Sequence, residues 1–221
     1  MPARRTALRR LGQLLVALGV GVLVVVGYQL QGTDLYAARA QSILRHSLEG
    51  EWARPQPSPA STSARVTLGD GVAILRVPRF GRGYVEVIVE GVGRTDLRHG
   101  PGHYPGTAMP GRVGNFAVAG HRTPFGAPFA RLGELRPGDA VVLETAHSWL
   151  TYRVTGSRIV APTAVSVIAP VPGAPNRAPT AVTLTLTTCN PRYSDRQRLV
   201  VFGVLAEKLA RSAGVPAALR A

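Results

Sequence analysis

The feature that most constrains this chain is an uncharged stretch near its start. Residues 11–33 carry no charged side chain, and residues 11–30 are strongly apolar. About twenty such residues form a helix long enough to cross the hydrocarbon core of a bilayer. Four arginines precede the stretch (Arg4, Arg5, Arg9 and Arg10), so the positive-inside rule keeps the N-terminus in the cytoplasm. We therefore predict one N-terminal transmembrane helix, with everything after residue 33 outside the cytoplasm.

A cleaved signal peptide is the competing interpretation of this stretch. The sequence Ala38-Arg39-Ala40 resembles a cleavage site. However, the apolar run is longer than the usual core of a signal peptide, and Asp34 and Arg39 interrupt the approach to that site. An uncleaved anchor is therefore favoured, and the arginine flank argues against a buried helix of a soluble protein.

A helix and a linker are expected between the anchor and the rest of the chain. Residues 34–52 have helical spacing, either as a stalk or as a helix packed on the following domain. One broad apolar face is expected to hold Leu35, Ala38, Ile43, Leu44, Leu48 and Trp52. Residues 54–65 are rich in Pro and Ser, which is typical of a linker. The expected divisions are a basic terminus at 1–10, the anchor at 11–33, helix and linker at 34–65, a folded domain at 66–206 and a tail at 207–221.

Beyond residue 66 the chain shows short apolar runs separated by turn signals. With 25 Gly and 18 Pro, it favours many turns over a helical bundle. Residues 91–114 should be mostly loop, 127–135 one short helix, and 161–179 a long loop or lid. Regular strand spacing predicts an all-β closed barrel or sandwich. The expected strands are 72–78, 84–90, 115–120, 140–145, 148–154, 183–188 and 199–205.

Charge and cysteine content exclude several functions. The net charge is +14, and residues beyond 33 still carry +10. These later arginines are scattered singly, without the basic runs and interleaved aromatics of a nucleic-acid interface, so no nucleic-acid partner is expected. They suit a surface facing an anionic envelope or lipid. A single cysteine excludes an internal disulfide and any multi-cysteine metal site.

That cysteine, Cys189, stands at the end of an alternating strand. Asn190-Pro191 interrupts the strand, and a second apolar run begins right after Arg198. A hairpin would bring Arg198 back close to Cys189. A nearby cation favours the nucleophilic thiolate, and an arginine can also hold a developing oxyanion. From the hairpin alone, a buried structural cysteine is an equally good interpretation.

His121 is the best candidate for a proton shuttle among the five histidines. It follows a strongly apolar strand and a glycine, a position that presents a side chain at the rim of a barrel. Covalent catalysis by a thiol requires a base within reach and a donor for the oxyanion. His121, Cys189 and Arg198 would supply these parts, although their meeting cannot be derived from sequence.

These segments resemble a known family, the sortases. The resemblance is carried by residues 187–189 (TTC), 198–201 (RLVV) and 115–122 (NFAVAGHR), in the order His, Cys, Arg. Residues 100–108 (GPGHYPGTA) are similar to class E sortases of high-GC Gram-positive actinobacteria. The resemblance covers roughly residues 70 to 206 and agrees with an anchor and a stalk.

The resemblance implies an eight-stranded sortase-type β-barrel with short helices and a cysteine transpeptidase activity. Cys189 would attack the Thr–Gly carbonyl of a C-terminal sorting signal, Leu-Pro-x-Thr-Gly or Leu-Ala-x-Thr-Gly, and form a thioester. His121 would move the protons and Arg198 would stabilise the oxyanion. Tyr104 and Thr188 would bind substrate. The expected partners are secreted proteins bearing that signal and the amine of a peptidoglycan precursor (lipid II), with no metal and no cofactor.

Two departures from the class E pattern leave the choice between Ala and Pro signals open. Asn190 stands where His is common, and Pro124-Phe125 stands where Thr-Tyr is common. An L,D-transpeptidase would carry a Ser-x-Gly-Cys-x-Arg-type motif, which this chain lacks around Cys189. Two alternatives stay open: a hydrolytic cysteine peptidase, and a non-catalytic anchored β-module that binds envelope components.

Overall fold

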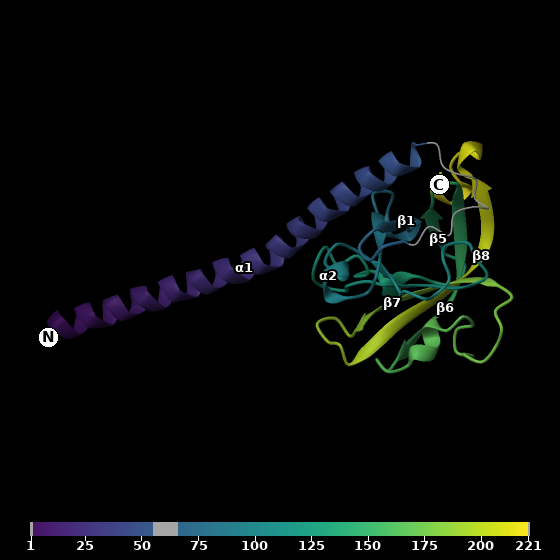
Figure 1. The fold of residues 1–221 in the computed structure, drawn as a ribbon. Coiled ribbons are helices and arrows are strands. Elements are labelled where there is room, and N and C mark those ends of the chain that lie inside the picture. Colours follow the sequence, from purple (N-terminus) through teal and green to yellow (C-terminus); the bar gives the residue numbers. More distant parts are fainter. Residues whose placement is uncertain (1, 55–65, 221) are drawn as a thin grey trace.

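The computed structural model describes residues 2–54 and 66–220, and it consists of a long helical arm and a β-barrel (Figure 1). Within these residues, eight strands close into a barrel in the order β1-β2-β3-β4-β7-β8-β6-β5. Their bounds are β1 Gly71–Arg76, β2 Val85–Glu90, β3 Gly102–His103, β4 Gly114–Ala119, β5 Ala140–Glu144, β6 Ser148–Val160, β7 Val182–Asn190 and β8 Gln197–Ala210. The eight-stranded sortase-type barrel predicted from the sequence is confirmed.

Alternation along the strands fills the barrel. Apolar side chains of every long strand point inward and form one core, which includes Ile88, Phe116, Tyr152 and Leu186. On β7 the hydroxyl face is buried as well, because the connection between β6 and β7 covers it. Thr185 there donates a hydrogen bond to Oδ1 of the buried Asn115 at 2.8 Å. The Asn115 amide in turn donates to Ala169 O at 3.1 Å, which ties this connection to the barrel.

The structure adds two short elements to one segment, which is mostly loop as predicted, and corrects the prediction for another. Residues 91–114 hold the short helix α2 (Arg94–Leu97) and the two-residue strand β3, which closes the barrel between β2 and β4. Two residues are too few for a periodic signal, so the strand could not be recognised in the sequence. The helix expected at 127–135 is only a 3₁₀ turn, η2 (Leu132–Glu134).

Strands β6 and β8 extend past their predicted ends and pair along almost their whole length. The tail after residue 206 accordingly begins as strand, since β8 continues to Ala210. Three 3₁₀ turns complete the described structure: η1 (Pro78–Phe80), η4 (Arg211–Ala213) and η5 (Ala217–Leu219). The remaining one of the five in the described residues, η3 (Val165–Ile168), interrupts the long loop predicted at 161–179.

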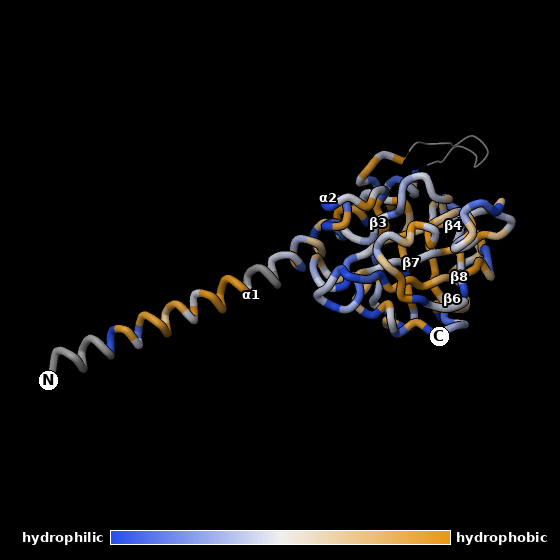
Figure 2. The backbone as a smooth tube through the Cα atoms, turned by 90° about the horizontal axis from the view of Figure 1, so that it is seen from below, coloured by the Kyte–Doolittle hydropathy of each residue, from blue (hydrophilic) through white to orange (hydrophobic). Residues whose placement is uncertain are grey.

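The segments predicted as anchor and stalk form one continuous helix, α1 (Pro2–Trp52). Its apolar side chains between residues 11 and 26 are exposed around the whole helix, and Leu14 and Leu23 are about 70% exposed. This part extends away from the barrel as a largely hydrophobic rod (Figure 2). It is long and apolar enough to cross a membrane. The expected linker at 54–65 lies outside the described residues except for Arg54.

The last third of α1 packs against the barrel, but not with the predicted face. Leu35, Ala38 and Ile43 are exposed, whereas Ala37 and Gln41 are buried. Of the predicted face, Leu44, Leu48 and Trp52 do pack, against Ile74 and Val87 of β1 and β2.

Gln41 is buried because the edge of β2 needs partners. Strand β3 pairs only with the end of β2, so it leaves the backbone of Val87 without a strand on that side. The Gln41 side chain accepts a hydrogen bond from Val87 N at 2.6 Å and donates to Val87 O at 3.0 Å. A buried amide with both ends bonded has the same effect as a paired strand residue.

Candidate active site

The barrel brings the ends of β4 and β7 to one rim. The two strands run parallel, with Ala119 opposite Thr187. Gly120 N continues the ladder by donating to Thr187 O at 3.0 Å. His121 lies two residues beyond Ala119, just past the end of β4, and Cys189 lies two residues beyond Thr187 on β7, so both residues are at the same edge of the barrel.

The antiparallel pairing of β7 and β8 adds Arg198 to this rim. Cys189 and Arg198 are direct register partners, as the hairpin predicted. The guanidinium of Arg198 donates to the carbonyls of Asp195 and Gln197 at 2.7 and 3.0 Å. Among the residues that the structure describes, no hydrogen bond joins the side chains of His121, Cys189 and Arg198. The fold thus brings the three residues to one edge of the barrel without a hydrogen bond between their side chains.

A second arginine, Arg122, lies beside the cysteine and was given no role by the sequence argument. Its Nη1 donates to Cys189 O at 3.1 Å and to Asn190 Oδ1 at 2.5 Å. Arg122 therefore holds the end of β7 to the segment that carries His121. The side chain of Asn190 serves as one of its two hydrogen-bond acceptors there. The only available signal was its place directly after the histidine.

His121 lies half-buried in a loop that folds back over the barrel. Its carbonyl accepts a hydrogen bond from Phe129 N at 2.9 Å. The ring of Phe125 packs beside the imidazole, with ring centroids 5.4 Å apart. Burial lowers the pKa of His121 below its ordinary value, because it disfavours the charged imidazolium. The neutral form, which can accept a proton, is therefore favoured near neutral pH.

The two predicted substrate residues lie close to this rim. Tyr104 is half-buried, and its hydroxyl lies 3.1 Å from Oγ1 of Thr187, two residues before the cysteine. Thr188 is only 2% exposed, and its hydroxyl donates to Gly120 O at 2.8 Å. That hydrogen bond gives Thr188 a structural role in joining β7 to β4, and its contact with substrate stays a prediction.

The histidine nearest to Tyr104 belongs to the core. His103 is 1% exposed; its Nδ1 lies 2.6 Å from Glu90 Oε2, and Thr107 Oγ1 lies 2.8 Å from its Nε2. Both ring nitrogens are thus engaged within the protein. In the described part of the chain, no three His, Cys, Asp or Glu side chains gather as a metal site would require.

Comparison with known proteins identifies this rim. Residues 75–206, which include His121, Cys189 and Arg198, match the family model of the sortase domain. The chain belongs to the sortase family. Members of this family are cysteine transpeptidases, and the single cysteine of this chain, Cys189, lies within the matched residues.

Particular sortases show how far the similarity extends. Sortase SrtE1 of Streptomyces coelicolor is 34% identical over 221 residues, which cover 96% of this chain and 61% of that relative. The SrtF sortase from Corynebacterium diphtheriae superposes with a TM-score of 0.69 at 33% identity, covering 75% of this chain and all of that one. Sortase E1 from Streptomyces coelicolor, solved with a tripeptide in the active site, gives a TM-score of 0.63 at 38% identity, covering 68% of this chain and 97% of that one. The class E resemblance predicted from residues 100–108 agrees with these names.

Proposed function

We propose that this sortase is a membrane-anchored transpeptidase that cuts a C-terminal sorting signal between Thr and Gly and transfers the protein to an amine of a peptidoglycan precursor. The observation that carries the proposal is the shared rim: His121 follows the end of β4, Cys189 lies at the end of its parallel neighbour β7, and Arg198 is the register partner of Cys189. The tripeptide held in the active site of sortase E1 supports a peptide substrate for the corresponding rim of this chain.

In the first half-reaction, neutral His121 takes the proton of the Cys189 thiol, and the resulting thiolate attacks the carbonyl carbon of the signal's threonine. The carbon–nitrogen bond to glycine breaks, and His121 protonates the departing amine. The product is a thioester on Cys189. Because a thioester retains the reactivity of an activated acyl group, no nucleotide is needed for the second half-reaction.

In the second half-reaction, the acceptor amine attacks the thioester and loses a proton to His121, and Cys189 leaves as thiolate. The lowered pKa of His121 suits it to accept this proton near neutral pH. Arg198 would release its turn carbonyls and direct its planar fork at the oxyanion formed in each half-reaction. Tyr104 would contact the residue of the signal that is Ala or Pro.

The helix α1 suits this chemistry, because the acceptor is borne by a lipid. Its exposed apolar part would cross the membrane with the arginine-rich end in the cytoplasm. The barrel would then lie outside the cytoplasm, where secreted proteins and the peptidoglycan precursor meet.

Mass spectrometry of the full chain in detergent tests this proposal. The protein is mixed with Leu-Ala-x-Thr-Gly or Leu-Pro-x-Thr-Gly peptides, with and without a glycine-based amine. We expect an adduct that has lost the glycine-side fragment, followed by transfer to the amine. Since the chain has one cysteine, any thioester adduct maps to Cys189. The control, Cys189→Ala, should keep the fold and form neither adduct nor product.

Each alternative has its own outcome. Release of the adduct by water alone, at a rate that the amine leaves unchanged, would indicate a hydrolytic peptidase. No adduct from either peptide, together with a thiol inert to alkylation, would support the non-catalytic binding module. Full turnover by Cys189→Ala would exclude the thioester route altogether.

A further inference from the structure

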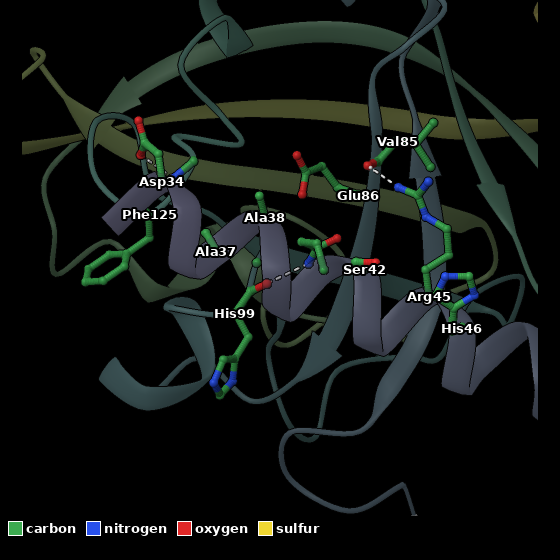
Figure 3. A pocket seen from close by; sticks show the side chains of 13 residues that line it. Asp34, Ala37, Ala38, Ser42, Arg45, His46, Val85, Glu86, His99 and Phe125 are labelled. Atoms are coloured by element: carbon green, nitrogen blue, oxygen red, sulfur yellow. Dashed lines mark hydrogen bonds between the residues drawn. The ribbon is translucent and has the colours of Figure 1, made fainter. Parts of the chain in front are cut away.

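The part of α1 that follows the apolar segment reaches the loop beside the catalytic histidine. One stripe of the helix faces the barrel, with Asp34, Ala37 and Gln41 in successive turns. Gln41 donates to His99 O at 2.6 Å as well as bonding β2, so the helix is held firmly one turn away from the loop. The three residues of this stripe line a cavity of about 510 Å³. Figure 3 shows Asp34 and Ala37 on the helix and Phe125 near Asp34 at one end of the pocket.

Asp34 forms a direct hydrogen bond between the helix and this loop. Its Oδ1 accepts a hydrogen bond from Gly126 N at 2.8 Å, across 92 positions of sequence. Ala37 is 3% exposed, and its Cβ would lie 3.5 Å from a Cβ at Gly126. The helix thus approaches this loop closely at two points.

The loop is also held at its C-terminal side, where Ala127 N donates to Pro124 O at 3.1 Å and Tyr84 Oη donates to Pro128 O at 2.8 Å, but its tip is strained. Phe125, Gly126 and Ala127 all have positive φ, at 55°, 74° and 43°, a conformation that side-chain-bearing residues rarely adopt without support. Cavities of about 510 and 710 Å³ lie against it, and Asp34 borders both of them. A conformation of this kind depends on the few contacts that hold it.

Phe125 transmits the loop's position to the site. Its ring packs beside His121 with centroids 5.4 Å apart, and the Arg98 guanidinium carbon lies 5.6 Å from the centroid of the same ring. Phe125 is therefore part of the surface that keeps water from the imidazole. A loop that loosened would move this ring and open His121 to solvent.

We propose that Asp34 is a positioning residue for His121: its hydrogen bond to Gly126 holds Phe125 against the imidazole, and so couples the membrane helix to the active site. This rests on the proposed function insofar as His121 is the proton shuttle. The contact also supplies a role for the departure Pro124-Phe125, since the phenyl ring packs on the imidazole without a hydroxyl to compete for its protons.

Asp34 could instead act on His121 by its charge, and the two routes have opposite signs. Loss of a nearby negative charge would lower the pKa of His121 further, whereas loss of the ring's cover would raise it toward the ordinary value. Asp34→Asn removes the charge and keeps an oxygen acceptor, while Asp34→Ala removes both. The other ionisable groups around this part of the rim, unchanged in both variants, are Arg98, Arg122, Cys189 and Arg198.

The experiment uses the full chain in detergent micelles, with ¹³C-labelled histidine. Five histidines are present, and the His121 resonance is assigned by its absence in His121→Gln. We expect Asp34→Ala to raise the His121 pKa and to lower kcat for peptide transfer on the order of tenfold, with KM little changed. Asp34→Asn should resemble the wild type in both readouts. Glu49→Ala is the matched control, because this exposed acid on the same helix has no side-chain partner among the described residues.

Three results would overturn the proposal. One is a His121 titration and kcat that Asp34→Ala leaves unchanged. Another is an equal downward shift of the His121 pKa in both Asp34 variants, which would indicate charge alone. The third is a full additional loss from Asp34→Ala in a Phe125→Ala background, since a route through Phe125 predicts none. The titration needs no substrate, so it still decides the contact if the wild type proves inactive on sorting peptides.

Discussion

Glu86 on β2 is an ionisable group whose burial should limit the stability of this protein. It lines the cavity beneath α1, and Figure 3 shows its carboxyl group facing the helix near Ala38. In the described part of the chain no hydrogen bond reaches this side chain. Burial raises the pKa of Glu86 from 4.5 to about 7, and the nearby positive charge of Arg45 only partly offsets this.

The sign and size of the effect follow from this pKa. Because Glu86 binds its proton more tightly in the folded chain than in the unfolded chain, its contribution to stability is fully present below about pH 4.5. It is lost as the pH rises through 7. At about 1.4 kcal/mol for each pH unit between the two values, ionised Glu86 lowers the free energy of unfolding by about 3 kcal/mol at pH 8.

Glu86→Gln removes this charge and keeps the shape of the side chain. We expect the variant to be about 3 kcal/mol more stable than the wild type at pH 8 and nearly equal to it at pH 4. Urea unfolding of the full chain in detergent would measure this, followed by the fluorescence of its two tryptophans, Trp52 on α1 and Trp149, which is 7% exposed in the barrel. Glu49→Gln, at an exposed position on α1, should leave the curve unchanged. A variant less stable than the wild type at pH 8 would refute the argument, since it would mean that Arg45 stabilises the carboxylate by more than burial costs.

Two further predictions concern the rim. Arg198→Lys should lower kcat for peptide transfer by on the order of tenfold or more, because one ammonium cannot reproduce the planar guanidinium fork. A wild-type kcat would show that only the positive charge at this position matters. Gly120→Ala should cost about 1–3 kcal/mol in urea unfolding, since its new Cβ would lie 2.6 Å from Cδ2 of the fully buried Phe129. An unchanged unfolding midpoint would show that this ring can move aside.

The rim itself was within reach of the sequence, because its parts are local. The apolar strand before Gly120-His121 and the alternating strand before Cys189 can both be recognised from the spacing of their apolar residues. The hairpin that returns to Arg198 follows from the break at Asn190-Pro191. Even so, only the parallel pairing of β4 with β7 brings the two strand ends together, and no local pattern encodes which strands pair.

The role of Arg122 could not be predicted from local sequence patterns. Its contact with the cysteine carbonyl depends on the direction in which one side chain leaves the loop after β4. Nothing in the spacing of residues 115–122 distinguishes that direction from one into solvent. The same holds for Tyr104, whose partner Thr187 lies 83 positions away.

The sequence by itself determined the long apolar helix, the period-two strands and the candidate catalytic residues at their ends. Each of these depends on residues within a few positions of each other. The tertiary structure decided what periodicity cannot, including which side of α1 is buried. There the polar Gln41 lies inside, while the apolar Leu35 and Ile43 lie outside. The physical reason is that the helix packs on the open edge of β2, where the backbone N–H and C=O of Val87 lack a strand partner. Leaving these groups without hydrogen bonds would cost more free energy than burying one more apolar side chain would gain, so Gln41 lies there.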